Sequence, residues 1–178
     1  STKSILARNR AVKWVGTTPI ELEVVGGEGR ATDAYAVSAD GSAVVGIQHP
    51  IEASLWKGGV TMLGMFPGGI SSYAMGVSAD GSVVVGMARH SNGDAEAFRW
   101  DGGAIQGLGD LEGGSRNSGA QGISADGKVI VGYGTSRISP VPVRWVNGVI
   151  ESLTGSGEAF AVSADGSVIV GSGAFIWT

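Results

Sequence analysis

The chain has 178 residues, of which 32 are glycine and none is cysteine, and its formal net charge at pH 7 is −4. This acidic balance, with only 16% charged residues, argues against a nucleic-acid partner, which requires a basic surface. No apolar run approaches the ~18 residues that a transmembrane helix needs, so we expect no direct insertion into a membrane.

A four-residue segment, Ser-Ala-Asp-Gly, recurs four times along the chain. The copies begin at Ser38, Ser78, Ser124 and Ser163. Each copy follows a valine or isoleucine and precedes a short β-branched run that ends in glycine. A period of about 40 residues indicates a repeat architecture.

The repeats divide the chain into one partial and four later segments. These are a partial blade at 1–33, repeats at 34–72, 73–114 and 115–156, and an incomplete repeat at 157–178. We interpret residues 1–178 as a single repeat domain. Both termini fall at the same point of the repeat, so the expected strands fit neither four nor five closed blades. We expect the chain to be an excerpt of a longer propeller; an incomplete blade that another chain completes is the alternative.

Each period is predicted to contain four β-strands. In the copy that begins at Tyr73, the first strand ends at Ser78, and the Asp-Gly turn forms a tight hairpin into a second strand that ends at Gly86. The third strand ends at Trp100, and the fourth covers residues 104–108. Helix patterns are almost missing, because glycine interrupts every apolar segment.

Both faces of these sheets are expected to be covered. The all-valine run at residues 83–85 indicates burial on both faces. Four strands per period with both faces covered are typical of a propeller blade. The prediction is an all-β, β-propeller-type array of four-stranded antiparallel blades, with about four full periods plus an overlapping partial blade. The tryptophans that end the third strands are expected in the core, with an aromatic ligand platform as the alternative: Trp14, Trp56, Trp100, Trp145 and Trp177.

The aspartate and glycine of each copy are expected to have a structural role. Glycine adopts a positive φ in such turns, and aspartate accepts hydrogen bonds from neighbouring backbone N–H groups. A calcium-binding ring of carboxylates is the alternative, but one aspartate per period cannot supply six to eight oxygen ligands, so no metal is expected. The residues are Asp40, Gly41, Asp80, Gly81, Asp126, Gly127, Asp165 and Gly166.

The loops between the second and third strands differ most between repeats. Repeat scaffolds place recognition on loops that vary, and plain loop variation without function is the alternative. The candidate contact residues are Arg89, His90, Asn92, Tyr133, Arg137 and Ile138. The repeat at 73–114 is locally acidic, and its acidic residues are interpreted as a solvated edge: Asp94, Glu96, Asp101, Asp110 and Glu112. No cofactor is expected, because the glycine pairs precede strands rather than helices.

The repeat resembles a known bacterial family. The segments 74–86, 97–100 and 108–114, supported by 63–69, are similar to the "probable extracellular repeat, HAF family". The resemblance covers nearly the whole chain. It implies a bacterial protein that is secreted or exposed at the cell surface and that is sometimes the passenger of an autotransporter. We therefore expect an extracellular or cell-surface location, with the periplasm as the alternative. It implies no defined catalytic activity.

The expected function is therefore a non-catalytic binding or adhesion module that contacts a protein or glycan through its variable loops. Self-association through the incomplete terminal blades is a further expectation. One alternative is a glycosidase or lyase with its site at the central opening, although the inner strands are small and apolar, with Gln121 as the polar exception. Another alternative is a structural spacer of a surface protein.

Overall fold

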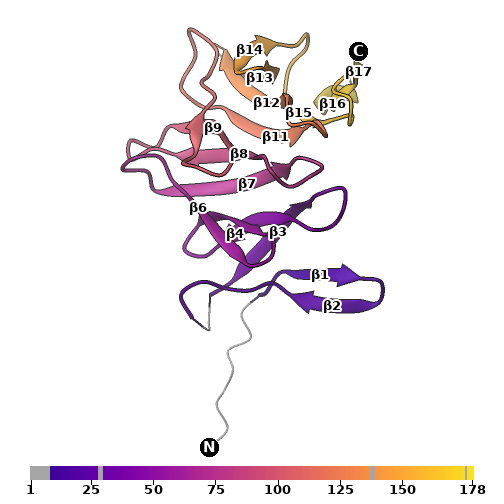
Figure 1. Ribbon diagram of the computed structural model, residues 1–178. Helices are drawn as coiled ribbons and strands as arrows, with labels where there is room; N and C mark the ends of the chain where they lie inside the picture. Colours follow the sequence, from indigo (N-terminus) through magenta and orange to yellow (C-terminus); the bar gives the residue numbers. More distant parts are fainter. Residues whose placement is uncertain (1–8, 28–29, 137–138, 175) are drawn as a thin grey trace, which may run out of the picture.

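The computed structural model describes residues 9–27, 30–136, 139–174 and 176–178. Within them the chain forms short antiparallel β-sheets that follow one another in sequence and stack from the N-terminal to the C-terminal end (Figure 1). A 3-10 turn covers Ser172–Ala174. The two predicted contact positions Arg137 and Ile138 lie outside the described residues.

The strands of each sheet are hydrogen-bonded in chain order, or in its reverse. The first sheet contains β1 (Val12–Val15) and β2 (Thr18–Glu21). The second contains β3 (Thr32–Val37), β4 (Val44–Gln48), β5 (Glu52–Trp56) and β6 (Val60–Gly64). The third contains β7 (Ser71–Val77), β8 (Val84–Arg89), β9 (Ala95–Trp100) and β10 (Gln106–Gly107). The fourth contains β11 (Gly119–Ile123), β12 (Val129–Ser136), β13 (Ser139–Val146) and β14 (Val149–Ser152), and the last contains β15 (Ala159–Val162), β16 (Ile169–Gly171) and β17 (Ile176–Trp177).

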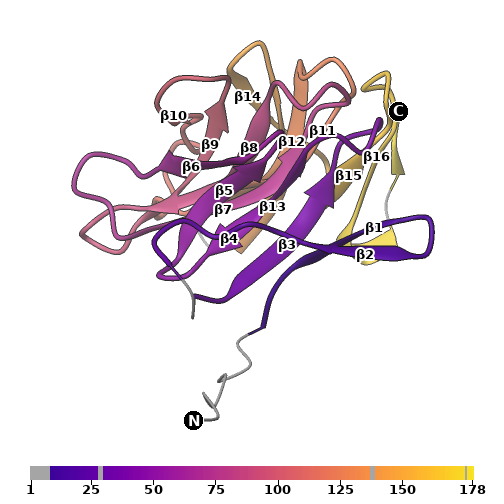
Figure 2. The ribbon, with the colours of Figure 1, turned by 60° about the horizontal axis from the view of Figure 1, so that its bottom comes forward.

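The expectation of four-stranded antiparallel sheets is confirmed for the second, third and fourth sheets. Among the described residues, the first sheet has two strands and the last has three. The first strands of successive sheets, β3, β7, β11 and β15, lie beside one another (Figure 2). Strands β3 and β7 begin at Thr32 and Ser71, slightly before the predicted repeat boundaries, because both residues already pair with the second strand of their sheet.

Strands β3, β7, β11 and β15 each contain a bulge, and this bulge explains the glycine that follows the β-branched run of the second strand. The predicted end of the second strand at Gly86 is wrong, because β8 stays paired with β7 and β9 as far as Arg89. In the third sheet, the register between β7 and β8 shifts between Ala74 and Gly76. A Cβ atom at Gly86, opposite the bulge, would overlap the carbonyl oxygen of Tyr73. The equivalent glycines of the other sheets face the same obstacle: Gly46, Gly132 and Gly171. Glycine is therefore required by the close approach of two backbones.

The core consists of layers between successive sheets. Val45 and Leu55 of the second sheet pack with Val84 and Phe98 of the third. Residues 83–85 are all buried: Val84 faces the second sheet, whereas the valines on either side of it face the fourth. The prediction that this strand is covered on both faces is confirmed.

The tryptophans do not share one environment. Trp56 and Trp145 are buried, as expected, but Trp14 is 65% exposed, so the core prediction is wrong for Trp14. Its face of the first sheet has no described sheet against it, whereas Trp56 and Trp145 each pack on a preceding sheet. Three indole N–H groups donate to a carbonyl oxygen after the last strand of the preceding sheet: Trp56 to Glu23, Trp145 to Leu108 and Trp177 to Thr154.

The same pattern of hydrogen bonds occurs in each of the four Ser-Ala-Asp-Gly hairpins. In the third sheet, the Ser78 hydroxyl donates to Asp80 Oδ1 over 2.7 Å and accepts a bond from the N–H of Val83. Asp80 Oδ1 also accepts from the N–H of Ser82, and Gly81 has a φ of +68°. The same serine–aspartate bond and positive φ recur at the other copies: Asp40 and Gly41, Asp126 and Gly127, Asp165 and Gly166.

Neighbouring hairpins are also bonded to each other along one edge of the stack, which we call the turn rim. The N–H of Ala79 donates to the carbonyl oxygen of Ala125, and the N–H of Ala125 donates to that of Ala164. Basic side chains of the third-strand segment reach the next hairpin: Lys13 bonds to Gly41, Lys57 to Asp80 and Arg99 to Gly127. The repeated motif therefore joins one sheet to the next.

Candidate functional site

The edge opposite the turn rim, here called the loop rim, carries two kinds of connection. One is the loop between the second and third strands of a sheet, and the other is the link from the fourth strand to the next sheet. In the third sheet these are residues 90–94 and 108–118. Because the strands are antiparallel, both connections lie at the same end of the sheet.

These two segments, together with the start of β9, line a pocket of about 380 Å³. Its charged and titratable lining residues are His90, Asp94, Glu96, Asp110, Glu112 and Arg116. Part of its wall is backbone, supplied by glycines 109, 113 and 114. We take this pocket as the candidate site.

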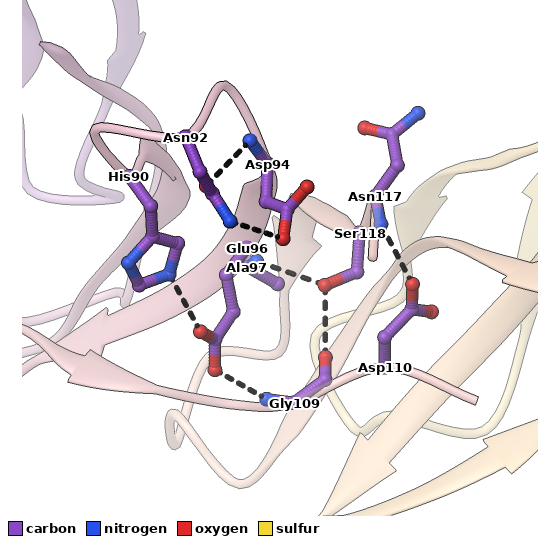
Figure 3. Close-up of polar contacts among 9 residues, drawn as sticks. All are labelled: His90, Asn92, Asp94, Glu96, Ala97, Gly109, Asp110, Asn117 and Ser118. Atoms are coloured by element: carbon purple, nitrogen blue, oxygen red, sulfur yellow. Dashed lines mark hydrogen bonds and ion pairs between the residues drawn. The ribbon is translucent and has the colours of Figure 1, made fainter. Parts of the chain in front are cut away.

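Glu96 ties three segments of the pocket together (Figure 3). Its Oε2 atom lies 3.0 Å from Nε2 of His90, and its Oε1 atom accepts a hydrogen bond from the N–H of Gly109. The imidazole of His90 stacks on the ring of Phe66 from the preceding link, with ring centroids 4.6 Å apart. The loop, strand β9 and the link are thus held in one arrangement.

Asp110 anchors the link to the fourth sheet. Its Oδ1 atom accepts from the N–H groups of Leu111 and Thr135, at 2.7 and 2.8 Å. Its Oδ2 atom accepts from the N–H of Asn117 at 2.9 Å (Figure 3). Both oxygens are therefore used to shape the backbone of the link.

Two smaller contacts complete the pocket wall (Figure 3). Ser118 Oγ accepts from the N–H of Ala97 and donates to the carbonyl oxygen of Gly109. At the tip of the loop, the side-chain amide of Asn92 donates to Asp94 Oδ2, and its oxygen accepts from the N–H of Asp94. These bonds give both segments a defined conformation, because three of the four satisfy a backbone group, at Ala97, Gly109 and Asp94.

Glu112 and Arg116 differ from the other lining residues. Both are exposed at the pocket mouth. Neither forms a hydrogen bond or ion pair with any residue that the structure describes. They are the charged groups of the pocket that a ligand could engage without breaking an existing contact.

A second group of polar residues lies on or next to the first and second strands of the third, fourth and last sheets, and we call it the inner group. The Tyr133 hydroxyl donates to Met87 Sδ at 3.3 Å. Burial raises the pKa of Tyr133 above its ordinary value, the charges of Glu158 and Asp110 raise it further, and the charge of Arg89 opposes them. Gln121, the polar exception among the inner strands, donates to the Glu158 carboxylate.

The structure separates the predicted contact residues into two groups. His90 lines the pocket and Asn92 shapes its loop, whereas Arg89 and Tyr133 belong to the inner group. The interpretation of the acidic residues as a solvated edge is wrong for Glu96 and Asp110, which are partly buried and accept backbone hydrogen bonds. Ser118 and Arg116 were not predicted, and nothing in their local sequence distinguishes them from other loop residues.

Among the described residues, no group of three or more histidine, cysteine, aspartate or glutamate side chains could hold a metal ion. The same part of the chain contains no helix long and apolar enough to cross a membrane.

Solved structures with the same arrangement of sheets identify the fold. TolB from Acinetobacter baumannii superposes with a TM-score of 0.60 at 20% sequence identity, over 90% of this chain and 42% of that one. A putative TolB from Agrobacterium tumefaciens superposes with a TM-score of 0.59 at 18% identity, over 79% of this chain and 53% of that one. The chain has a β-propeller-type fold.

The propeller chain thus spans about half the length of these neighbours or less. At such identities the likeness establishes the fold of the propeller and not its ligand. No protein-family model matches the chain, and no curated protein matches it. The predicted array of antiparallel blades is confirmed by the sheets and by these neighbours.

Proposed function

We propose that the chain is a non-catalytic binding module that recognises a protein or glycan at its loop rim. The observation that carries the proposal is the pocket between residues 90–94 and 108–118. Its wall is held by backbone hydrogen bonds of Glu96 and Asp110, while Glu112 and Arg116 are exposed at its mouth. A preformed surface with free charged groups suits recognition, because little conformational freedom is lost when a ligand binds.

The use of the carboxylates supports binding rather than catalysis. A glycosidase needs two carboxyl groups on either side of the bond that breaks. In this pocket, Glu96 is engaged by His90 and Gly109, and both oxygens of Asp110 accept backbone hydrogen bonds. These carboxylates shape the loops of the scaffold.

The proposed location is the extracellular space or the bacterial cell surface, with the periplasm as the alternative compartment. Support comes from the resemblance of the Ser-Ala-Asp-Gly repeat to the HAF family. An adhesive role in a surface protein accords with that resemblance, and binding through the loop rim distinguishes it from a pure spacer.

Binding to a glycan array, measured for the wild-type protein and the Arg116→Glu variant, tests the glycan form of the proposal. Hydrogen bonds to charged groups contribute about 1.5–3 kcal/mol, so the substitution should weaken binding at least about tenfold. Asp101→Lys, a comparable charge reversal in an exposed turn of the opposite rim, is the matched control and should leave binding unchanged.

A protein ligand is tested with a photo-crosslinking amino acid at position 116 or, as the control, at position 101, in the cells that make the protein. A specific adduct from position 116 alone supports the proposal. If the wild-type protein binds no glycan and position 116 gives no adduct, the chain is a spacer and the binding proposal is wrong.

A further inference from the structure

The dipeptide Asn-Gly occurs twice in the chain, at Asn92-Gly93 and at Asn147-Gly148. In this dipeptide the backbone nitrogen of glycine can attack the side-chain carbonyl carbon of asparagine, because glycine has no Cβ atom to obstruct the approach. The reaction needs a free glycine N–H and an asparagine side chain that can turn toward it. The two copies differ in both respects.

The first copy is held in its loop by hydrogen bonds on both reacting groups. The side-chain amide of Asn92 donates to Asp94 Oδ2 over 2.9 Å, and its oxygen accepts from the N–H of Asp94 over 3.1 Å (Figure 3). The N–H of Gly93 donates to the carbonyl oxygen of His90 over 3.0 Å. Attack within this copy would require all three bonds to break.

The second copy forms the turn between β13 and β14. Asn147 and Gly148 are both exposed, and the flanking residues Val146 and Val149 are paired with each other. Neither the side chain of Asn147 nor the N–H of Gly148 forms a hydrogen bond with any residue that the structure describes. Both reacting groups are therefore free of competing bonds and open to water.

We propose that Asn147 is a deamidation site and that the fold protects Asn92 from the same reaction. A bond forms between the nitrogen of Gly148 and Cγ of Asn147, and the side-chain nitrogen leaves as ammonia, which takes up the proton of the Gly148 N–H. Water then opens the resulting five-membered imide at either carbonyl carbon and gives aspartate or isoaspartate at position 147. The only co-reactant is water, which solvent supplies at this exposed turn.

Isoaspartate should disturb this turn, because its main chain contains one more carbon atom than that of aspartate. The turn places only two residues between Val146 and Val149, and in such a hairpin the turn fixes the register of the strands. Strand β14 is an edge strand that pairs with β13 alone among the described strands. Formation of isoaspartate should therefore loosen the pairing of β14.

Peptide mapping by mass spectrometry, during incubation of the 178-residue protein at mildly alkaline pH, tests the proposal. We expect Asn147 to convert at least about tenfold faster than Asn92, because each hydrogen bond that must break adds to the barrier. In guanidinium chloride the two rates should become similar, since the unfolded chain keeps none of these bonds. Equal rates in the folded protein, or a ratio of rates that unfolding leaves unchanged, would overturn the proposal.

The protection of Asn92 is tested with Asp94→Ala, which removes the carboxylate that holds the Asn92 amide. Conversion at Asn92 should become faster in this variant, and conversion at Asn147 should keep its wild-type rate. An unchanged rate at Asn92 would contradict the protection that we assign to this contact.

The effect on β14 is measured by hydrogen exchange of the isoaspartate form, separated by chromatography. Asn147→Asp is the control: it adds the same charge without the extra carbon atom, and aspartate tolerates the φ of +52° at this position. Amides of β14 should exchange faster in the isoaspartate form than in the control. Equal exchange would show that isoaspartate leaves the hairpin intact.

Discussion

The aspartates of the four hairpins show what a single residue contributes to this fold. Each sits on an exposed turn, yet its Oδ1 atom accepts a hydrogen bond from a serine hydroxyl and another from a backbone N–H. Hydrogen bonds from Ser38 and Ser42 lower the pKa of Asp40 to about 2, and equivalent bonds lower those of Asp126 and Asp165 to about 2. The charged carboxylate is therefore the form that the folded hairpin prefers.

This preference predicts a loss of stability in acid. An aspartate in an unfolded chain has a pKa of about 3.9, so the folded protein holds fewer protons than the unfolded one between this value and about pH 2. The contribution of the hairpins is complete above about pH 4 and declines as the pH falls toward 2. Urea midpoints measured from pH 5 to pH 2 should show the decline.

In the Asp40→Asn variant the decline should be shallower, because the amide can still accept hydrogen bonds but does not titrate in this range. Glu112→Gln, at a carboxylate without a described hydrogen bond, is the control and should follow the wild-type curve. Identical slopes for Asp40→Asn and the wild-type protein would contradict the role given to these hydrogen bonds.

At the scale of the element, the hairpin has two functions that the sequence motif does not separate. It turns the chain between the first and second strands, and it packs against the neighbouring sheet. Gly81 has a φ of +68°, and a Cβ atom built on it would lie 2.5 Å from Cβ of Ala43 in the second sheet. Glycine is thus required both by the turn and by the contact between sheets.

Substitution of Gly81 by valine should lower the free energy of unfolding by at least about 1 kcal/mol, because it adds backbone strain to a steric clash. Gly93→Val provides the matched control: its φ is also positive, at +91°, but nothing lies within 4 Å of a Cβ atom there. Thermal and urea denaturation of both variants should show the larger loss for Gly81→Val. Equal losses would mean that the contact with Ala43 adds nothing to the strain.

The elements also show where sequence reasoning succeeds. The short β-branched runs and the Asp-Gly turns predict the presence and order of the strands correctly, because both are local features of the chain. The glycine that follows the β-branched run of each second strand has a different basis. At Gly86 it is required by the bulge in β7, which brings the carbonyl oxygen of Tyr73 too close for a side chain. A bulge depends on the pairing of two strands and leaves no distinct local pattern.

At the scale of the molecule, stability should vary along the stack. The second, third and fourth sheets are covered on both faces by described sheets, whereas the first and last are covered on one. Local opening is easiest where few apolar contacts must be broken. The ends of the stack should therefore open more often than its middle.

Hydrogen exchange measured by mass spectrometry, at a concentration low enough to dissociate any oligomer, should show this gradient. We expect the amides of β8 and β12 to exchange at least about tenfold more slowly than those of β1 and β17. The comparison of β4 with β16 controls for position within a sheet, since both are second strands. Uniform protection from β1 to β17 would show that the stack opens as one unit.

In the candidate site, too, the sequence predicts features that depend on one segment and not those that depend on two. The sequence points to the variable loop with His90 and Asn92, because loop length and composition can be compared between repeats. It does not pair that loop with residues 108–118, which follow in the chain after two strands. The hydrogen bonds from Gly109 to Glu96 and from Thr135 to Asp110 depend on the positions of folded segments.

The sequence by itself therefore determined the strands, the turns, the phase of the repeat and the propeller-type blades, since all of these follow from residue order within one period. The tertiary structure decided which tryptophans are buried, which acidic residues shape a pocket, and which faces at the two ends remain open. Trp14 and Trp145 occupy the same repeat position, yet one is exposed and the other buried. Their difference arises because the burial of each side chain depends on whether another sheet packs against it. The residues of the repeat motif do not determine whether that sheet is present.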